Sequence, residues 1–157
     1  MSRPTNDASR KYLPARSMEV TADVPTIQQM VHSSLKKNHY SRDASSTDNI
    51  FRYYHGNLVT EMVSNATGWD LIKMMAGRPT GFGQIVAWVE ATADGHRLSL
   101  SLTTGVAQAK FISIIFDELV AQFSGTGQLL RVSEPYSGMD LPLESPGRPL
   151  MHGGRKT

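Results

Sequence analysis

The chain has 157 residues, a formal net charge of +2 and no cysteine, and 39% of its residues are hydrophobic. A chain of this length and composition is typical of one globular domain with a conventional core. The lack of cysteine excludes disulfides, thiolate metal sites and cysteine nucleophiles from this chain.

The positive charge is concentrated at the two ends of the sequence. Residues 1–17 carry four basic and one acidic side chain, residues 18–124 carry eight and ten, and residues 125–157 carry four and three. Nucleic-acid binding depends on clustered cations that neutralise backbone phosphates. The central region lacks such a cluster, so we expect no nucleic-acid partner.

The two ends are also predicted to differ from the middle in order. Residues 1–17 are polar, include two prolines and contain no apolar run of the length that a signal peptide or a membrane span requires. We therefore expect a cytoplasmic protein without a membrane span. Residues 1–17 are predicted to be a flexible basic arm, residues 125–157 a flexible tail rich in Gly and Pro, and residues 18–124 a single domain.

The domain is predicted to begin with a strand and a helix. Residues 18–22 alternate apolar and polar side chains, as a half-buried strand does. Asp23 is a suitable N-cap, and Pro25 is favourable in a first helical turn. The apolar residues of this helix have the spacing of one buried stripe: Ile27, Met30, Val31 and Leu35. Asn38 is the predicted end, and residues 41–49 are predicted to form a loop.

A first hairpin and a short helix are predicted next. Residues 50–55 and 58–64 are rich in β-branched and aromatic side chains and flank the Gly-Asn pair at 56–57. Residues 68–76 follow a capping threonine and are followed by Gly77, which predicts a short helix.

The last elements are a second hairpin and a long helix. Residues 84–92 and 97–104 flank an Asp-Gly turn, and the second of them alternates leucine with serine or threonine. Residues 107–124 carry apolar side chains at helical spacing. A small edge strand is predicted at residues 128–133.

This order of elements predicts an α+β fold of two layers. An antiparallel β-sheet is expected, covered on one face by the N-terminal helix and the long C-terminal helix.

No motif in the sequence indicates catalysis or a metal site. His32 and His39 are seven residues apart, about 10 Å along a helix axis, which is too far to share one ion. HExxH, HxH and GxSxG are absent, and residues 77–83 lack the Lys-Ser/Thr of a P-loop. The remaining histidines have no partner at ligand spacing: His55, His96 and His152. We expect no enzyme activity, no metal and no cofactor.

Aromatic and methionine side chains are the remaining candidates for a site. Tyr54, Trp69, Met74 and Trp88 are predicted to line a groove for a ligand or a partner at one end of the sheet. In the competing interpretation, such side chains only fill the layer between sheet and helix.

Four segments have a layout that is similar to a known type of domain, and the similarity covers about two thirds of the chain. They are residues 19–31, the aromatic strand ending at Gly56, residues 84–102 and residues 111–123. Their layout resembles small bacterial helix-grip, START-like domains of the actinobacterial type. The resemblance implies a curved antiparallel sheet crossed by a long C-terminal helix, and some such domains enclose lipids or other apolar ligands. The order of elements is also similar to that of secretion chaperones.

Three functional hypotheses follow. The first is a non-enzymatic binding or assembly module that binds a protein partner or a second copy of itself. The second is a carrier that holds a small apolar ligand in a cleft between the sheet and the C-terminal helix. The third is a secretion-chaperone-like module.

Overall fold

The computed structural model describes residues 13–56, 82–105 and 108–149. The elements in this part of the chain are β1 (Pro14–Val20), α2 (Val24–Lys37), β2 (Ser41–Arg42), β3 (Ile50–His55), β4 (Gly83–Ala91), β5 (His96–Thr104), α5 (Ala109–Gly125), β6 (Leu129–Val132), β7 (Tyr136–Ser137) and the 3₁₀ helix η2 (Gly138–Asp140). The predicted strand at residues 58–64 and the predicted helix at residues 68–76 lie outside the described residues.

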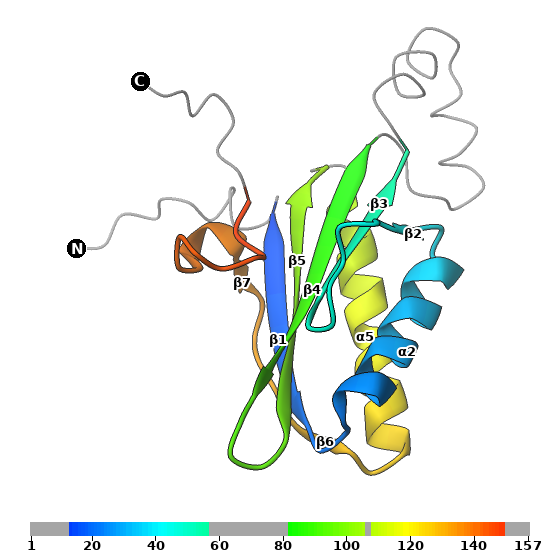
Figure 1. Ribbon diagram of the computed structural model, residues 1–157, viewed down its shortest axis with the longest axis vertical. Helices are drawn as coiled ribbons and strands as arrows, with labels where there is room; N and C mark the ends of the chain where they lie inside the picture. The colour runs from blue at the N-terminus through cyan, green and yellow to red at the C-terminus, as the bar shows by residue number, and fades with distance from the viewer. Residues whose placement is uncertain (1–12, 57–81, 106–107, 150–157) are drawn as a thin grey trace, which may run out of the picture.

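The strands form one antiparallel sheet in the order β2-β3-β4-β5-β1-β6, and β7 also pairs with β1. Helices α2 and α5 lie together on one face of this sheet (Figure 1). The predicted α+β class, with an antiparallel sheet and two covering helices, is confirmed.

Helix α2 begins where its capping residue indicates. The Asp23 carboxylate accepts a hydrogen bond from the backbone N–H of Thr26 at 3.0 Å, which satisfies one of the free N–H groups of the first turn. Ile27, Val31 and Leu35 are fully buried, so the predicted stripe is the face that packs on the sheet.

The same helix ends at Asn38, as predicted, and the next residue is left-handed. His39 has a φ of 73°, and its N–H donates to the carbonyl of Lys36 at 3.0 Å. The N–H of Tyr40 donates to the carbonyl of Leu35 at 2.9 Å. This is the Schellman arrangement, in which two backbone donors satisfy carbonyls of the last turn. A histidine occupies the position that is most often glycine.

The core lies between the sheet and the two helices. Leu98, Leu100 and Leu102 alternate along β5, and all three are fully buried on the face toward the helices. Helix α5 faces them with its buried residues Phe111, Ile112, Ile115, Phe116, Leu119 and Phe123. The predicted second hairpin, long helix and edge strand are present as β4–β5, α5 and β6.

Strand β1 is longer than predicted, because it begins at Pro14 and includes residues assigned to the arm. Its register places Ala15 opposite Ser101 and Ser17 opposite Ser99. Arg16 points toward α5, where its guanidinium lies 4.5 Å from the centre of the Phe116 ring. An arginine at an inward position hides the apolar alternation that otherwise indicates a strand.

The domain also continues beyond the predicted boundary at Ser124. Strands β6 and β7 both pair with β1, and the chain then crosses the sheet on the side opposite the helices up to Pro149. The division between a domain at 18–124 and a tail is therefore too early for the described residues. Residues 41–42, predicted as loop, likewise pair with β3 as the short strand β2.

We expect Leu100→Ala to lower the free energy of unfolding by about 2–5 kcal/mol, because the shortened side chain leaves a cavity in the centre of the core. Urea denaturation measures this change. Leu143→Ala is the control: its side chain is 82% exposed, and the change is expected to stay within about 0.5 kcal/mol. Equal losses in the two variants would contradict the burial of Leu100.

The pKa of the Asp23 carboxyl lies below its ordinary value of 3.8, because Thr26 donates hydrogen bonds to it. A folded-state pKa below the unfolded one stabilises the fold above pH 3.8, and this contribution disappears as the pH falls further. Asp23→Asn keeps a capping oxygen but cannot titrate. We expect the wild-type chain to lose stability relative to Asp23→Asn on acidification to about pH 2.5 in urea titrations. A constant difference would show that Asp23 has the same pKa when the chain is unfolded.

Candidate functional site

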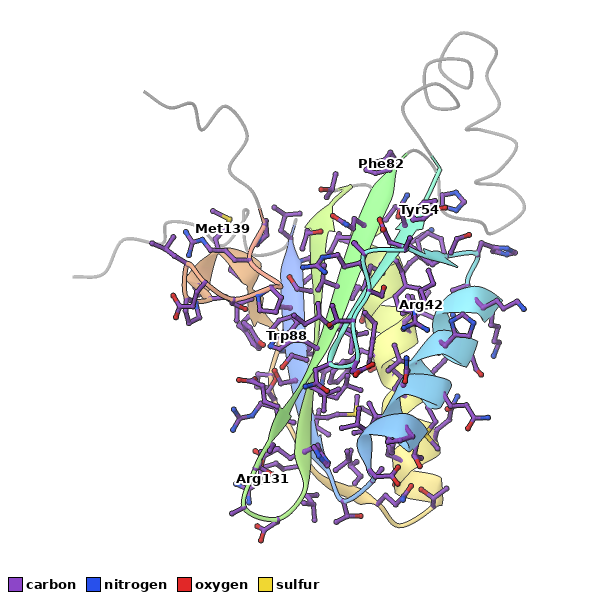
Figure 2. All side chains as sticks on the ribbon, viewed as in Figure 1. Arg42, Tyr54, Phe82, Trp88, Arg131 and Met139 are labelled. Carbon is purple, nitrogen blue, oxygen red and sulfur yellow. The ribbon has the colours of Figure 1, made fainter. Side chains whose placement is uncertain are left out.

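The candidate site lies on the sheet face that points away from the helices, which we call the outer face. Val86 and Trp88 of β4 and Ser99 and Ser101 of β5 belong to this face, yet each is at most 6% exposed. The polypeptide that covers them is residues 136–149, which we call the C-terminal strap. Met139, which belongs to the strap, and Trp88 of β4 lie on the same side of the sheet (Figure 2).

The strap touches the outer face through the backbone of Gly147. A Cβ atom on this residue would overlap Cζ3 and Cη2 of Trp88, so a side chain does not fit here without movement. The carbonyl of Gly147 accepts a hydrogen bond from Ser101 Oγ at 2.7 Å. Because Ser101 is fully buried, this bond satisfies a hydroxyl that has no access to water.

Internal hydrogen bonds give the strap its own shape. Arg148 Nη1 donates to the carbonyls of Met139 and Leu141 at 2.8 and 2.6 Å. Ser137 Oγ accepts from the N–H of Met139 at 3.1 Å. These bonds fold the strap into a loop that returns across the sheet, with Gly147 in contact with Trp88.

A groove of about 730 Å³ remains beside the strap, and we call it the Trp88 groove. Its sides are formed by the sheet, by the residues before β3 and by the strap. The lining residues are Ser17, Asn49, Ile50, Trp88, Val89, Glu90, Arg97, Ser99, Ser133, Tyr136, Leu141, Pro142, Glu144, Ser145 and Pro146. The groove therefore combines an indole and aliphatic surface with hydroxyl and amide groups.

Three hydroxyl groups of the groove, those of Ser17, Ser99 and Tyr136, form a hydrogen-bonded network. Ser17 Oγ lies 2.9 Å from Ser99 Oγ and 2.7 Å from the hydroxyl of Tyr136. None of these contacts involves a histidine or a carboxylate that would act as a base toward a serine. The network presents hydroxyl donors and acceptors at the wall of the groove.

Charges surround the groove in near balance. Glu90, Arg97 and Glu144 line it. Arg97 also lies 3.9 Å from Glu19, whose carboxylate is 3.7 Å from Arg131. Such exposed pairs contribute little stability. They leave the groove without the concentrated positive charge that a polyanion would require.

A second hollow, of about 350 Å³, lies elsewhere along the strap. Arg52, Gln84 and Val86 contribute to it from the sheet, and Ser145 and Pro146 of the strap line both hollows. The strap is thus a narrow bridge across the outer face, with open space along it.

The structure separates two residues of the predicted groove, Tyr54 and Trp88. Tyr54 pairs with Gln84 and Trp88 pairs with Ile50, so the two aromatic residues are about 13 Å apart along the sheet. Both belong to the outer face, but Tyr54 does not line the Trp88 groove. Trp69 and Met74 lie outside the described residues.

Three of the residues that line the groove with Trp88 lie in segments that sequence patterns predict to be flexible ends. Ser17 belongs to the predicted arm, and Tyr136 and Pro146 belong to the predicted tail. One signal was available: Ser99 and Ser101 alternate with buried leucines, and small side chains on a sheet face permit the close approach of another backbone. Nothing in the local sequence indicates which backbone approaches.

Tyr40 and Tyr53 are buried and do not line the Trp88 groove. The Tyr40 hydroxyl donates to Gln108 Oε1 at 2.5 Å, and burial raises the pKa of Tyr40 above its ordinary value. Burial also raises the pKa of Tyr53, while the positive charge of Arg42 opposes that rise. Both phenols are therefore uncharged across the physiological range.

Two of the four described histidines contact backbone carbonyls through a ring nitrogen. His55 Nδ1 lies 2.9 Å from the carbonyl of His39, and His96 Nδ1 lies 2.9 Å from that of Ala22. A carbonyl only accepts, so Nδ1 carries the proton in both rings. In the three described ranges, His, Asp and Glu side chains form no group of three or more that could hold a metal ion.

No protein-family model, curated protein or solved structure matches the chain. Neither of the two described α-helices is long and apolar enough to cross a membrane.

Ser101→Ala removes the hydroxyl that binds the carbonyl of Gly147. We expect a loss of roughly 1–3 kcal/mol in the free energy of unfolding, because the carbonyl is left buried without its donor. Chemical denaturation measures this loss. Ser124→Ala, at an exposed position of α5, is the control and is expected to stay within about 0.5 kcal/mol. Similar values for both variants would show that the bond does not hold the strap.

Proposed function

We propose that the chain is a non-enzymatic binding and assembly module that holds an extended segment of a protein in the Trp88 groove. The volume of about 730 Å³ is within the range of about 300–1,000 Å³ that is usual for ligand sites. An aromatic surface with a few positioned hydroxyls is also the usual composition of such sites.

The observation that supports a polypeptide ligand is the strap itself. Its Pro-Gly pair at residues 146–147 lies on the outer face, with the glycine backbone against Trp88 and the glycine carbonyl bonded to Ser101. The outer face therefore already binds a peptide backbone. Ser101 bonds to the carbonyl of Gly147, and the lack of a side chain on Gly147 lets its backbone lie against Trp88. Aromatic grooves that receive proline-containing segments use the same combination of ring contact and hydrogen bonding.

The chemistry of the groove favours binding over catalysis. The hydroxyls of Ser17 and Ser99 bond to each other, and that of Ser17 also bonds to Tyr136, rather than to a base. The carrier hypothesis would place an apolar ligand between the sheet and α5. Trp88 lies on the opposite face of the sheet and would not line such a cleft.

Selection from a random peptide library tests this proposal. We expect peptides that bind the wild-type chain, and we expect Asn49→Trp to weaken their binding at least about tenfold, or 1.4 kcal/mol. Asn49 is exposed and lines the groove, so an indole at this position obstructs it.

Gln122→Trp is the matched control, because it adds the same indole at an exposed position of α5. Its affinity for the selected peptides should equal that of the wild type. Isothermal titration calorimetry measures both variants. A library that yields no binders, or binders that are insensitive to Asn49→Trp, would overturn the proposal.

A further inference from the structure

We propose that the C-terminal strap exchanges between two copies of this chain, so that the strap of one copy covers Trp88 of the other. The inference deepens the proposed function, because it identifies a second copy as the assembly partner and rests on the groove described above. Residues 136–149 are the exchanged segment.

The contacts of the strap are made to groups that any copy of the chain presents. Strand β7 pairs with the first residues of β1, Pro14 opposite Ser137 and Ala15 opposite Tyr136. Gly147 contacts Trp88 and Ser101. A strap that arrives from a second copy forms the same contacts, which is the energetic basis of segment exchange in symmetric dimers.

The connection to the strap is short and irregular. Residues 133–135 join β6 to β7, and the last two of them are exposed. The N–H of Ser133 donates to the carbonyl of Ser17, whereas Tyr136 pairs with Ala15. Two residues of β1 are thus spanned by three residues of the connection, as in a bulge. Short hinges of this kind favour exchange, because the strap can leave by a local change at the hinge.

The balance of contacts favours a second copy over an unrelated protein as occupant. A foreign segment that took the place of the strap on Trp88 would have to displace a strap whose effective concentration is in the millimolar range, and the displaced strap would lose its contacts. Reciprocal exchange keeps every contact of both straps. Only the loss of translational and rotational freedom on association opposes it.

Exchange makes the Trp88 groove a site shared by two copies. Trp88, Ser99 and Ser17 would come from one copy. The partner copy would supply the strap residues that line the groove, which are Tyr136, Leu141, Pro142, Glu144, Ser145 and Pro146. A ligand in the groove would then contact both copies and stabilise the dimer.

Complementation between two defective full-length chains tests the exchange. One chain carries Gly147→Val, which keeps Trp88 but spoils the strap, and the other carries Trp88→Ala, which keeps the strap. Both also carry Trp69→Phe, so that Trp88 of the first chain is the only tryptophan in the mixture. Alone, the Gly147→Val chain should emit at longer wavelength than the chain with Trp69→Phe only.

Adding an excess of the Trp88→Ala chain should return the emission to shorter wavelength, and light scattering should show the mass of two chains. A donor with both Trp88→Ala and Gly147→Val supplies only a spoiled strap and should have no effect. Trp88→Phe is the donor if the alanine variant does not fold.

Each outcome decides the proposal. Restoration by the intact strap alone, or rescue of folding if the Gly147→Val chain is unfolded by itself, supports exchange. Unchanged emission or absent rescue overturns it, as does Trp88 emission that Gly147→Val does not alter. The readout requires no added ligand, so this test can fail while peptides sensitive to Asn49→Trp still bind, and the reverse also holds.

Discussion

Strands β4 and β5 are buried on both faces, and this constraint organises the rest of the structure. Their inward side chains, such as Leu100, pack against the two helices, whereas Trp88 and Ser101 point away from them. The indole of Trp88 is apolar, and the buried hydroxyl of Ser101 requires a hydrogen-bond partner. Both side chains must therefore contact another segment of polypeptide. The strap supplies that cover through Gly147, whose backbone fits against the ring and whose carbonyl accepts from Ser101.

The helices and the strap cover the two faces of the sheet to different extents, and this difference determines where the candidate site lies. Helices α2 and α5 supply broad apolar faces that pack against the inner face of the sheet. The strap is a single irregular segment, so it covers Trp88 and leaves a groove of about 730 Å³ and a hollow of about 350 Å³ along its course. We therefore propose that this partly covered surface binds another polypeptide. The same chemistry supports the proposed groove and the proposed exchange of straps.

Local sequence patterns predicted the elements whose apolar residues recur with a regular period. The stripe of Ile27, Val31 and Leu35 and the capping carboxylate of Asp23 identified α2, and the alternating leucines of β5 identified the second hairpin. The start of β1 was missed because Arg16 stands at an inward position and packs on Phe116. The candidate groove was only partly anticipated: Trp88 belongs to it, but Tyr54 lies about 13 Å away along the sheet.

Sequence alone determined the α+β class, the antiparallel hairpin of β4 and β5 and the helices α2 and α5, because each depends on periodicity within a few turns or a few strand residues. Tertiary structure decided where the ends of the chain go. Ser17 meets Ser133 and Tyr136 across more than a hundred residues, and Ser101 meets Gly147 across 46. Such pairings produce no periodic pattern in the local sequence. Gly147, Ser101 and the prolines of the strap acquire their role only because the folded sheet places Trp88 on its outer face.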